Sequence, residues 1–247
     1  LLLFFCLCYG PHPTLHSFPT RRSSDLIGAL ITSLLQLGTG HMSSHGISKY
    51  QPLKLAAAEG HFEKEAPATL YILGWVDEEN QKVIGIGIPG MVGFLLSGDF
   101  DMPVKGLNSF KKEEWPPVNI VFQTYHGMVG IGMLLILISM IGTFLWKKGT
   151  LSENRFMLWV LVFSALGPHI ANELGWMTAE IGRQPWIVYN LMKTVDGVSK
   201  SITVGHVWAS LILFTLIYAV LFCLFIFLLF QKIKMGPEEG ALHEERK

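Results

Sequence analysis

The stretch GWMTAEIGRQPW, Gly175–Trp186, places a carboxylate and a guanidinium, Glu180 and Arg183, at the end of a hydrophobic segment. Ionisable residues within an apolar span normally face the interior of a helix bundle and mark a functional path. Four side chains in and before this stretch share one helical stripe, because they follow at i, i+4, i+7 and i+11: His169, Glu173, Trp176 and Glu180. The polar chemistry of this segment therefore points in one direction.

A simpler interpretation of the same residues is a salt bridge between Glu180 and Arg183 that closes the end of the helix. The spacing of three residues allows such a pair on a helix surface. This alternative leaves Glu173 unexplained, since that carboxylate lies about two turns deeper in the segment. Both interpretations remain open from the spacing alone.

The composition is that of a membrane protein. Half of the 247 residues are hydrophobic and only 15% are charged, and the mean hydropathy is +0.41, which leaves too little polar surface for a soluble globule. The formal net charge is zero and no basic run is present, so binding to nucleic acid is excluded. The cysteines, Cys6, Cys8 and Cys223, offer neither a disulfide framework nor a spaced metal site.

Hydropathy predicts the helical spans. A helix needs about 20 mostly apolar residues to cross roughly 30 Å of hydrocarbon, and three segments qualify: residues 118–146, 154–178 and 202–231. Residues 27–45 are too short alone, and we expect them to form the end of a transmembrane helix whose beginning has been replaced. The predicted fold is an all-α, polytopic membrane helical bundle fragment.

Charge sets the expected topology. Basic residues follow the first and third spans, so the positive-inside rule places their connection and residues 232–247 in the cytoplasm. Residues 46–117 and 179–201 then form extracytoplasmic loops. The first is long and too apolar for a disordered segment, and we expect it to fold against the membrane surface or a partner.

The first residues resemble a segment that does not belong to the native protein. SFPTRRSSDL, Ser17–Leu26, is the translation of a DNA sequence that resembles a common sequencing-library adapter. The preceding apolar run has neither basic residues ahead of it nor a clear cleavage site after it, unlike a signal peptide. We therefore expect residues 1–26 to be non-native.

Two further patterns resemble ligand-binding motifs but favour interpretations without a ligand. GIGIPG, Gly85–Gly90, has the letters of a dinucleotide-binding fingerprint but lacks the strand-turn-helix context, so we interpret it as a turn-rich apolar loop. His41 and His45 are four residues apart, yet no third ligand accompanies them. They are interpreted as a polar exit from the first span.

Two other patterns carry candidate chemistry. In KLAAAEG, Lys54 and Glu59 form either a solvated charge pair or part of a site that takes protons from a quinol. In YHGMVGIGM, His126 and Met128 are about 200° apart on a helix, so only one of them can bind a given metal centre. A thioether is a suitable sixth ligand of a low-spin haem, although a methionine in an apolar helix is more often a packing residue.

Taken in order, KLAAAEG, IPG, DMPVKGL, YHGMVGIGM and GWMTAEIGRQPW resemble the C-terminal half of subunit I of the cytochrome bd-type quinol oxidases. The resemblance implies a haem-bearing subunit that transfers electrons from membrane quinol to dioxygen, which is reduced to water, and contributes to the proton-motive force. It implies low-spin and high-spin b haems and a third haem of d or b type. The implied partners are subunit II and a possible small accessory subunit, in a prokaryotic plasma membrane.

The resemblance also assigns roles to single residues. Met128 matches the axial methionine of the low-spin b haem, and Glu180 matches the glutamate ligand of the high-spin b haem. Trp176 resembles the aromatic residue between the haems and Arg183 the arginine near their propionates, on the stripe that also carries Glu173. Lys54 and Glu59 match the quinol-site pair of the family's long outer loop, the Q-loop, here residues 46–117.

This sequence departs from the family pattern in several respects. The family's histidine ligands belong to spans that precede Ile27, so we expect the fragment alone to be inactive. His126 stands where some members have an arginine, and the Q-loop resembles the short type. Two rivals remain: a haem-free transporter in which Glu173 and Glu180 line an ion path, and a truncated structural paralogue.

Overall fold

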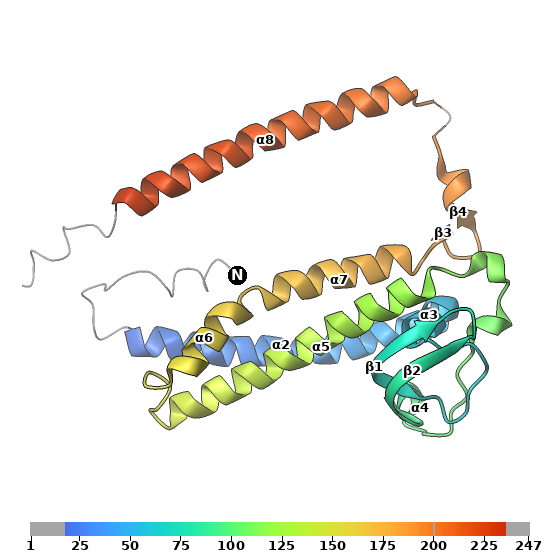
Figure 1. Ribbon diagram of the computed structural model, residues 1–247, viewed down its shortest axis with the longest axis horizontal. Helices are drawn as coiled ribbons and strands as arrows, with labels where there is room; N and C mark the ends of the chain where they lie inside the picture. Colours follow the sequence, from blue (N-terminus) through green and yellow to red (C-terminus); the bar gives the residue numbers. More distant parts are fainter. Residues whose placement is uncertain (1–17, 200, 236–247) are drawn as a thin grey trace, which may run out of the picture. The chain divides into compact units, whose positions relative to one another are not determined.

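The computed structural model describes residues 18–199 and 201–235 (Figure 1). Helix α2, Phe18–Tyr50, is continuous, so it extends beyond the predicted residues 27–45 at both ends. Within it, Leu26 packs on Leu151 and Met157 in a small apolar cluster. The non-native origin of residues 1–26 stays a prediction, and residues 1–17 and 236–247 lie outside the described part of the chain.

Three helices are long and apolar enough to cross a membrane, by length and composition: Val118–Lys147, Arg155–Ile181 and Val204–Lys234. The first is α5, Val118–Lys147. The second consists of α6, Arg155–Ser164, and α7, Gly167–Ile181. The third corresponds to α8, Val204–Met235, which belongs to a separate unit of the structure.

The expected all-α class is confirmed for most of the chain but omits two small sheets. Strands β1, Leu70–Asp77, and β2, Lys82–Ile88, form an antiparallel hairpin. Strands β3, Trp186–Val188, and β4, Met192–Lys193, form another. The structure therefore contradicts the interpretation of GIGIPG as a turn-rich loop, because Gly85–Ile88 lies within β2.

Residues 46–117 form a folded region in which short helices and strands alternate with irregular segments. It contains the end of α2, then α3, Pro52–Glu59, the β1–β2 hairpin, α4, Met91–Ser97, and two 3₁₀ turns, Leu107–Ser109 and Lys112–Glu114. Helix α3 begins at a proline, which suits the first turn, and ends at Gly60, whose φ of 72° favours glycine. Outside this region, a further 3₁₀ turn, Thr194–Gly197, follows β4.

The main apolar core joins α3, β1 and the first turns of α5. Its most buried side chains are Leu107, Val118, Val121 and Phe122, and α3 contributes a row of alanines to the same cluster. Small alanines let α3 approach α5 closely, and burial of the large side chains stabilises the arrangement. Residues 46–117 are thus anchored on the start of a predicted membrane span.

Candidate functional site

Helix α7 packs along α5 through small residues (Figure 1). The Thr178 hydroxyl donates a 2.9 Å hydrogen bond to the Thr124 hydroxyl between the two helices. A Cβ atom at Gly175 would lie 2.8 Å from the sulfur of Met128, and one at Gly127 would lie 3.0 Å from Leu174. Larger residues at these glycines would force the helices apart, so this close approach fixes the position of the Met128 thioether against α7.

The predicted stripe on α7 lies on the side turned away from this contact. His169, Glu173 and Trp176 are all exposed, whereas Thr178 is buried against α5. Trp176 is 62% exposed, a high value for a residue in an apolar span. The three side chains share one open face of α7, as the spacing predicts.

At the end of α7, Glu180 and Arg183 form an ion pair. Both side chains are 41% exposed, and a pair of this exposure contributes only about 0 to 1 kcal/mol. The salt bridge that was the simpler alternative is therefore present. Its presence does not exclude a further ligand for the Glu180 carboxylate.

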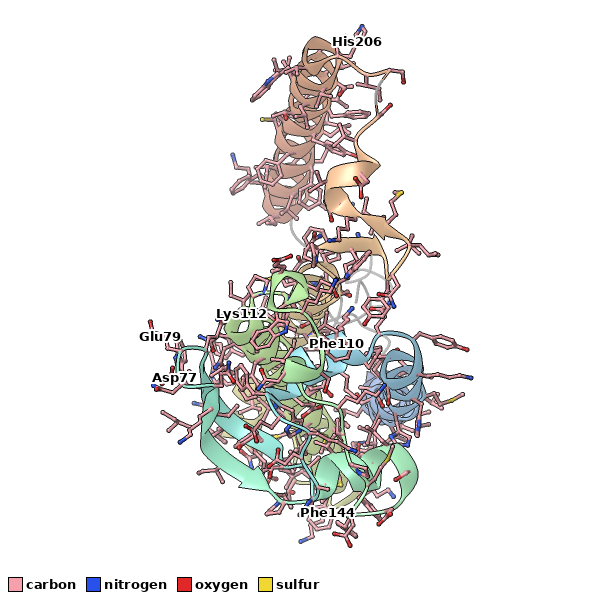
Figure 2. All side chains as sticks on the ribbon, turned by 90° about the vertical axis from the view of Figure 1, so that its right-hand side faces the viewer. Asp77, Glu79, Phe110, Lys112, Phe144 and His206 are labelled. Carbon is pink, nitrogen blue, oxygen red and sulfur yellow. The ribbon has the colours of Figure 1, made fainter. Side chains whose placement is uncertain are left out.

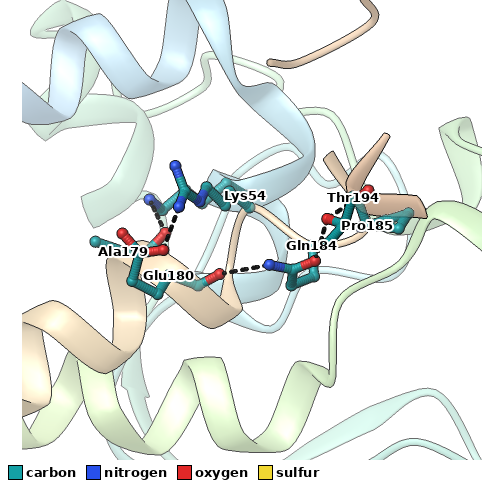
Figure 3. A network of polar contacts seen from close by, with 7 residues as sticks. Lys54, Ala179, Glu180, Gln184, Pro185 and Thr194 are labelled. Atoms are coloured by element: carbon teal, nitrogen blue, oxygen red, sulfur yellow. Dashed lines mark hydrogen bonds and ion pairs between the residues drawn. The ribbon is translucent and has the colours of Figure 1, made fainter. Parts of the chain in front are cut away.

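A polar network extends from this ion pair to α3 and the β3–β4 hairpin (Figure 3). The Lys54 ammonium donates a 3.0 Å hydrogen bond to the Ala179 carbonyl oxygen. The Gln184 amide donates to the Glu180 carbonyl oxygen at 3.4 Å, and Thr194 donates to the Gln184 side chain at 2.7 Å. These contacts hold Lys54 against the C-terminal end of α7, where carbonyl groups attract a cation.

A pocket of about 80 Å³ opens beside this network, between the start of α3 and the chain that follows α7. Its lining includes two cations, two aromatic rings and an amide: Lys54, Arg183, Trp186, Tyr189 and Gln51. The indole Nε1 of Trp186 is buried without a hydrogen-bond partner among the described residues. Burial and the neighbouring Arg183 lower the pKa of Lys54, and Glu180 opposes this effect. The lining thus combines hydrogen-bonding groups with aromatic rings.

Glu59 lies at the other end of α3 and is only 3% exposed. Its carboxyl interacts with the hydroxyl of Tyr125 on α5, and its Oε2 atom has no hydrogen-bond partner in the described structure. Burial raises the pKa of Glu59 from 4.5 to about 7, and the Tyr125 hydrogen bond only partly opposes this shift. The carboxyl is therefore poised to gain or lose a proton near neutral pH.

The structure places Lys54 and Glu59 on different sides of α3. Residues five apart on a helix are separated by about 140°, and Lys54 contacts α7 whereas Glu59 contacts α5. The described residues contain no ion pair between them. The interpretation as a solvated charge pair was wrong, because Glu59 is buried and has a different partner.

Sequence reasoning missed two residues, Tyr125 and His61. Tyr125 is the hydroxyl partner of Glu59, and His61 is a buried histidine, 2% exposed, whose Nδ1 lies 2.7 Å from Glu65 Oε2. The Glu65 side chain is 41% exposed, so this pair connects the interior to solvent. Burial lowers the pKa of His61, and the Glu65 carboxylate opposes that effect. Residues 61–65 are not helical, so the spacing of His61 and Glu65 gave no signal of this contact in the sequence.

Comparisons with known proteins agree with this architecture. The family model for cytochrome bd terminal oxidase subunit I matches residues 18–237. The chain belongs to this family. A putative cytochrome bd menaquinol oxidase subunit I of Bacillus subtilis (strain 168) is 42% identical over 217 residues, which cover 86% of this chain and 48% of the relative. A cytochrome bd ubiquinol oxidase subunit 1 of the same strain is 33% identical, over 83% of this chain and 46% of the relative.

More distant relatives and a solved structure extend the comparison. The cytochrome bd-II ubiquinol oxidase subunit 1 of Escherichia coli (strain K12) is 25% identical, over 90% of this chain and 56% of the relative. The structure of bd oxidase from Geobacillus thermodenitrificans matches with a TM-score of 0.74 and 31% identity, over 96% of this chain and 54% of that one. The bd-family chain thus spans about half the length of the relatives it matches.

Haem is the cofactor that the bd oxidase family implies, and the α5 surface fits a flat group. Gly132 lies one turn from Met128 on nearly the same helix face, and a Cβ atom at Gly132 would meet nothing within 4 Å. Absence of a side chain there allows a macrocycle to approach the helix beside the thioether. The His126 Nδ1–H donates a 2.9 Å hydrogen bond to the Phe122 carbonyl oxygen.

The next feature is the pair of histidines on α2, which we considered as possible metal ligands. The His41 and His45 ring nitrogens are 3.2 Å apart and exposed. Within residues 18–199 and 201–235, no group of three or more His, Cys, Asp or Glu side chains is placed to hold a metal ion. This pair stays a polar feature of α2.

Burial of Glu59 predicts a pH dependence of stability in the bd subunit. A carboxyl whose pKa is raised in the folded state stabilises the fold fully below the unfolded pKa, here about 4.5, and that contribution is lost as the pH rises to about 7. The shift corresponds to about 3 kcal/mol. We expect the melting temperature of the parent protein to fall between pH 5 and 8 and that of Glu59→Gln to fall less. Thermal unfolding monitored by circular dichroism measures both.

The matched control for this prediction is Glu63→Gln, because Glu63 is exposed and four residues away. The control should keep the pH dependence of the parent protein. Equal slopes for the parent and for Glu59→Gln would show that the Glu59 carboxyl is not the group responsible.

Proposed function

We propose that this chain is the quinol-oxidising and haem-holding part of a quinol:dioxygen oxidoreductase of the cytochrome bd type. The observation that carries the proposal is the buried Glu59 carboxyl, whose pKa of about 7 suits a proton acceptor at neutral pH. Family membership supplies the reaction class, since the relatives are named menaquinol and ubiquinol oxidases.

The protein groups have separate tasks in this proposal. Lys54, at the wall of the pocket with Trp186 and Tyr189, donates a hydrogen bond to a quinol oxygen and stabilises negative charge that develops on it. Glu59 does not line this pocket and faces Tyr125 on the other side of α3, so it accepts the proton that the quinol releases through intermediate carriers. His61 and Glu65 offer that proton a route to solvent, because one is buried and the other is partly exposed.

The proposed haem-facing residues lie on α5 and α7. Met128 would hold the iron of the low-spin b haem, and Glu180 the iron of the high-spin b haem. Trp176 and Glu173 line the exposed stripe, and Arg183 pairs with propionates. Haem iron supplies the one-electron chemistry that conveys electrons from quinol towards dioxygen. The third haem, of d or b type, the partner subunit II and a small accessory subunit complete the proposed complex in a prokaryotic plasma membrane.

Expression of the full-length subunit together with its partner subunit tests the proposal. We expect purified membranes to give a b-type pyridine haemochrome spectrum and to consume dioxygen when a quinol is added. Membranes from the host without the two subunits provide the control. A haem-free protein would overturn the proposal and favour a transporter, in which Glu173 and Glu180 face an ion path.

A further inference from the structure

The β1–β2 hairpin has one apolar face that the fold does not cover. Cross-strand neighbours Leu73 and Ile86 are 70% and 71% exposed, and the next pair, Trp75 and Ile84, is 62% and 69% exposed. The opposite face carries Val76, which is 2% exposed and packs in the core beside α5. The hairpin thus shows the reverse of the usual pattern, in which the solvent face of an antiparallel sheet is polar.

Glycines on the inner face of the hairpin allow close packing on α5 and between the two strands. A Cβ atom at Gly74 would lie 3.4 Å from the Phe122 ring, and one at Gly85 would overlap the Leu73 carbonyl oxygen. The Gln123 side chain donates a 2.7 Å hydrogen bond to the Gly74 carbonyl oxygen. The isoleucines between the glycines of β2 consequently point away from α5.

Hydrogen bonds also fix the direction of the hairpin along α5. The backbone N–H of Asn119 donates to the Glu78 carboxylate at 2.9 Å, and its side chain accepts from Val76 at 3.4 Å. Gly74 is paired with Gln123, about one turn further along α5. The hairpin turn therefore lies by the N-terminal end of α5, and the apolar pairs lie by the turns that follow.

The length of α5 places those turns at a known depth. Its 30 residues span about 45 Å, whereas the hydrocarbon layer is about 30 Å thick. The other end of the helix carries Lys147 and Lys148, which belong at the cytoplasmic surface. Roughly the first ten residues of α5 then lie in the outer interfacial region, and these are the residues that the hairpin contacts.

The charged residues of the hairpin are at the end that lies nearest the start of α5. Asp77, Glu78, Glu79 and Lys82 lie at the turn or its edges, and Figure 2 shows Asp77 and Glu79 at that end. On the face of the apolar pairs, the next pair after Trp75 and Ile84 is Asp77 and Lys82, so this face passes from charged residues at the turn to apolar residues further along. Trp75, opposite Ile84, is the apolar residue of β1 nearest the charged end on this face, which suits the preference of tryptophan for membrane interfaces.

We propose that the exposed face of the β1–β2 hairpin, formed by Leu73, Trp75, Ile84 and Ile86, inserts into the outer lipid leaflet beside α5. The lipid at the boundary between headgroups and acyl chains covers these side chains. The charged turn stays in water. The hairpin is then a membrane anchor of the Q-loop region, independent of the redox chemistry proposed above.

Fluorescence of a single introduced label tests this placement. Ile86→Cys lies on the apolar face, and Asn80→Cys, in the exposed turn, is the matched control. Each full-length variant is labelled with an environment-sensitive fluorophore in nanodiscs of phosphatidylcholine and phosphatidylglycerol. The unsubstituted protein, labelled in parallel, gives the background from its own cysteines.

We expect a nitroxide on the upper acyl chain of the lipid to quench the label at position 86 several-fold more than the label at position 80. Aqueous iodide should show the opposite order. Equal iodide quenching at both positions would overturn the proposal, because the face would then be in water. Protection from both quenchers at position 86 would also overturn it, since another subunit or a second copy would then cover the face. Leu73→Cys repeats the measurement on the facing strand.

Discussion

Replacing Glu59 by glutamine in the full-length subunit is expected to slow quinol oxidation by about 10²- to 10⁴-fold, the usual contribution of a positioned acid or base. Glutamine keeps the size and the hydrogen-bonding capacity of the side chain but cannot take up a proton. The haem absorption bands should remain unchanged, because Glu59 faces Tyr125 and α3 lies outside the proposed ligand set. Steady-state quinol-dependent dioxygen uptake and reduced-minus-oxidised spectra give the two readouts.

The pH profile of this variant adds a second test. The parent requires the ionised carboxylate, whose pKa is about 7, as the proton acceptor, so its rate should rise as the pH passes from 6 to 8. Glu59→Gln should lose that rise. Glu63→Gln, a change at an exposed position, should retain both the rate and the profile. Loss of haem from Glu59→Gln would assign the residue to structure rather than to proton transfer.

The sequence contained enough information for the helical spans, but not for the hairpins. Apolar runs of more than 20 residues have few alternatives in a membrane, so α5 and α8 follow from hydropathy alone. In VIGIGIPG, the alternation of isoleucine and glycine has the period of a strand, but glycines commonly mark turns. Recognising β2 needs its partner β1, against whose backbone Gly85 and Gly87 pack closely.

In the candidate site too, some features could be predicted from the sequence and others could not. The stripe on α7 depends only on helix periodicity, and the structure leaves His169, Glu173 and Trp176 on one exposed face. The environment of Glu59 depends on a contact between segments about 65 residues apart in the chain, α3 and α5. No local pattern reports that a carboxylate five residues from a lysine is buried. Tertiary packing therefore separates two residues that appear as a charge pair in the sequence.

In the full-length oxidase, Met128→Leu is expected to abolish the low-spin b haem signal, whereas Glu180→Ala should perturb the high-spin signal selectively. The two residues lie on different helices, α5 and α7, and match different ligand positions of the family. Leucine fills the space of the thioether beside Gly175 without a sulfur to donate to iron. Absorption and magnetic circular dichroism spectra of the reduced protein separate the two haems.

The rival account of Glu180 makes a different prediction for the same variant. If this carboxylate only forms the ion pair with Arg183, its removal costs about 0 to 1 kcal/mol, since both side chains are 41% exposed, and every haem remains. Glu63→Ala is the control for the change in net charge. It also removes one exposed carboxylate, but at a position outside α7. Retention of all haem signals and full dioxygen consumption in Glu180→Ala would make the helix-end salt bridge the better account, whereas selective loss of the high-spin signal identifies Glu180 as an iron ligand.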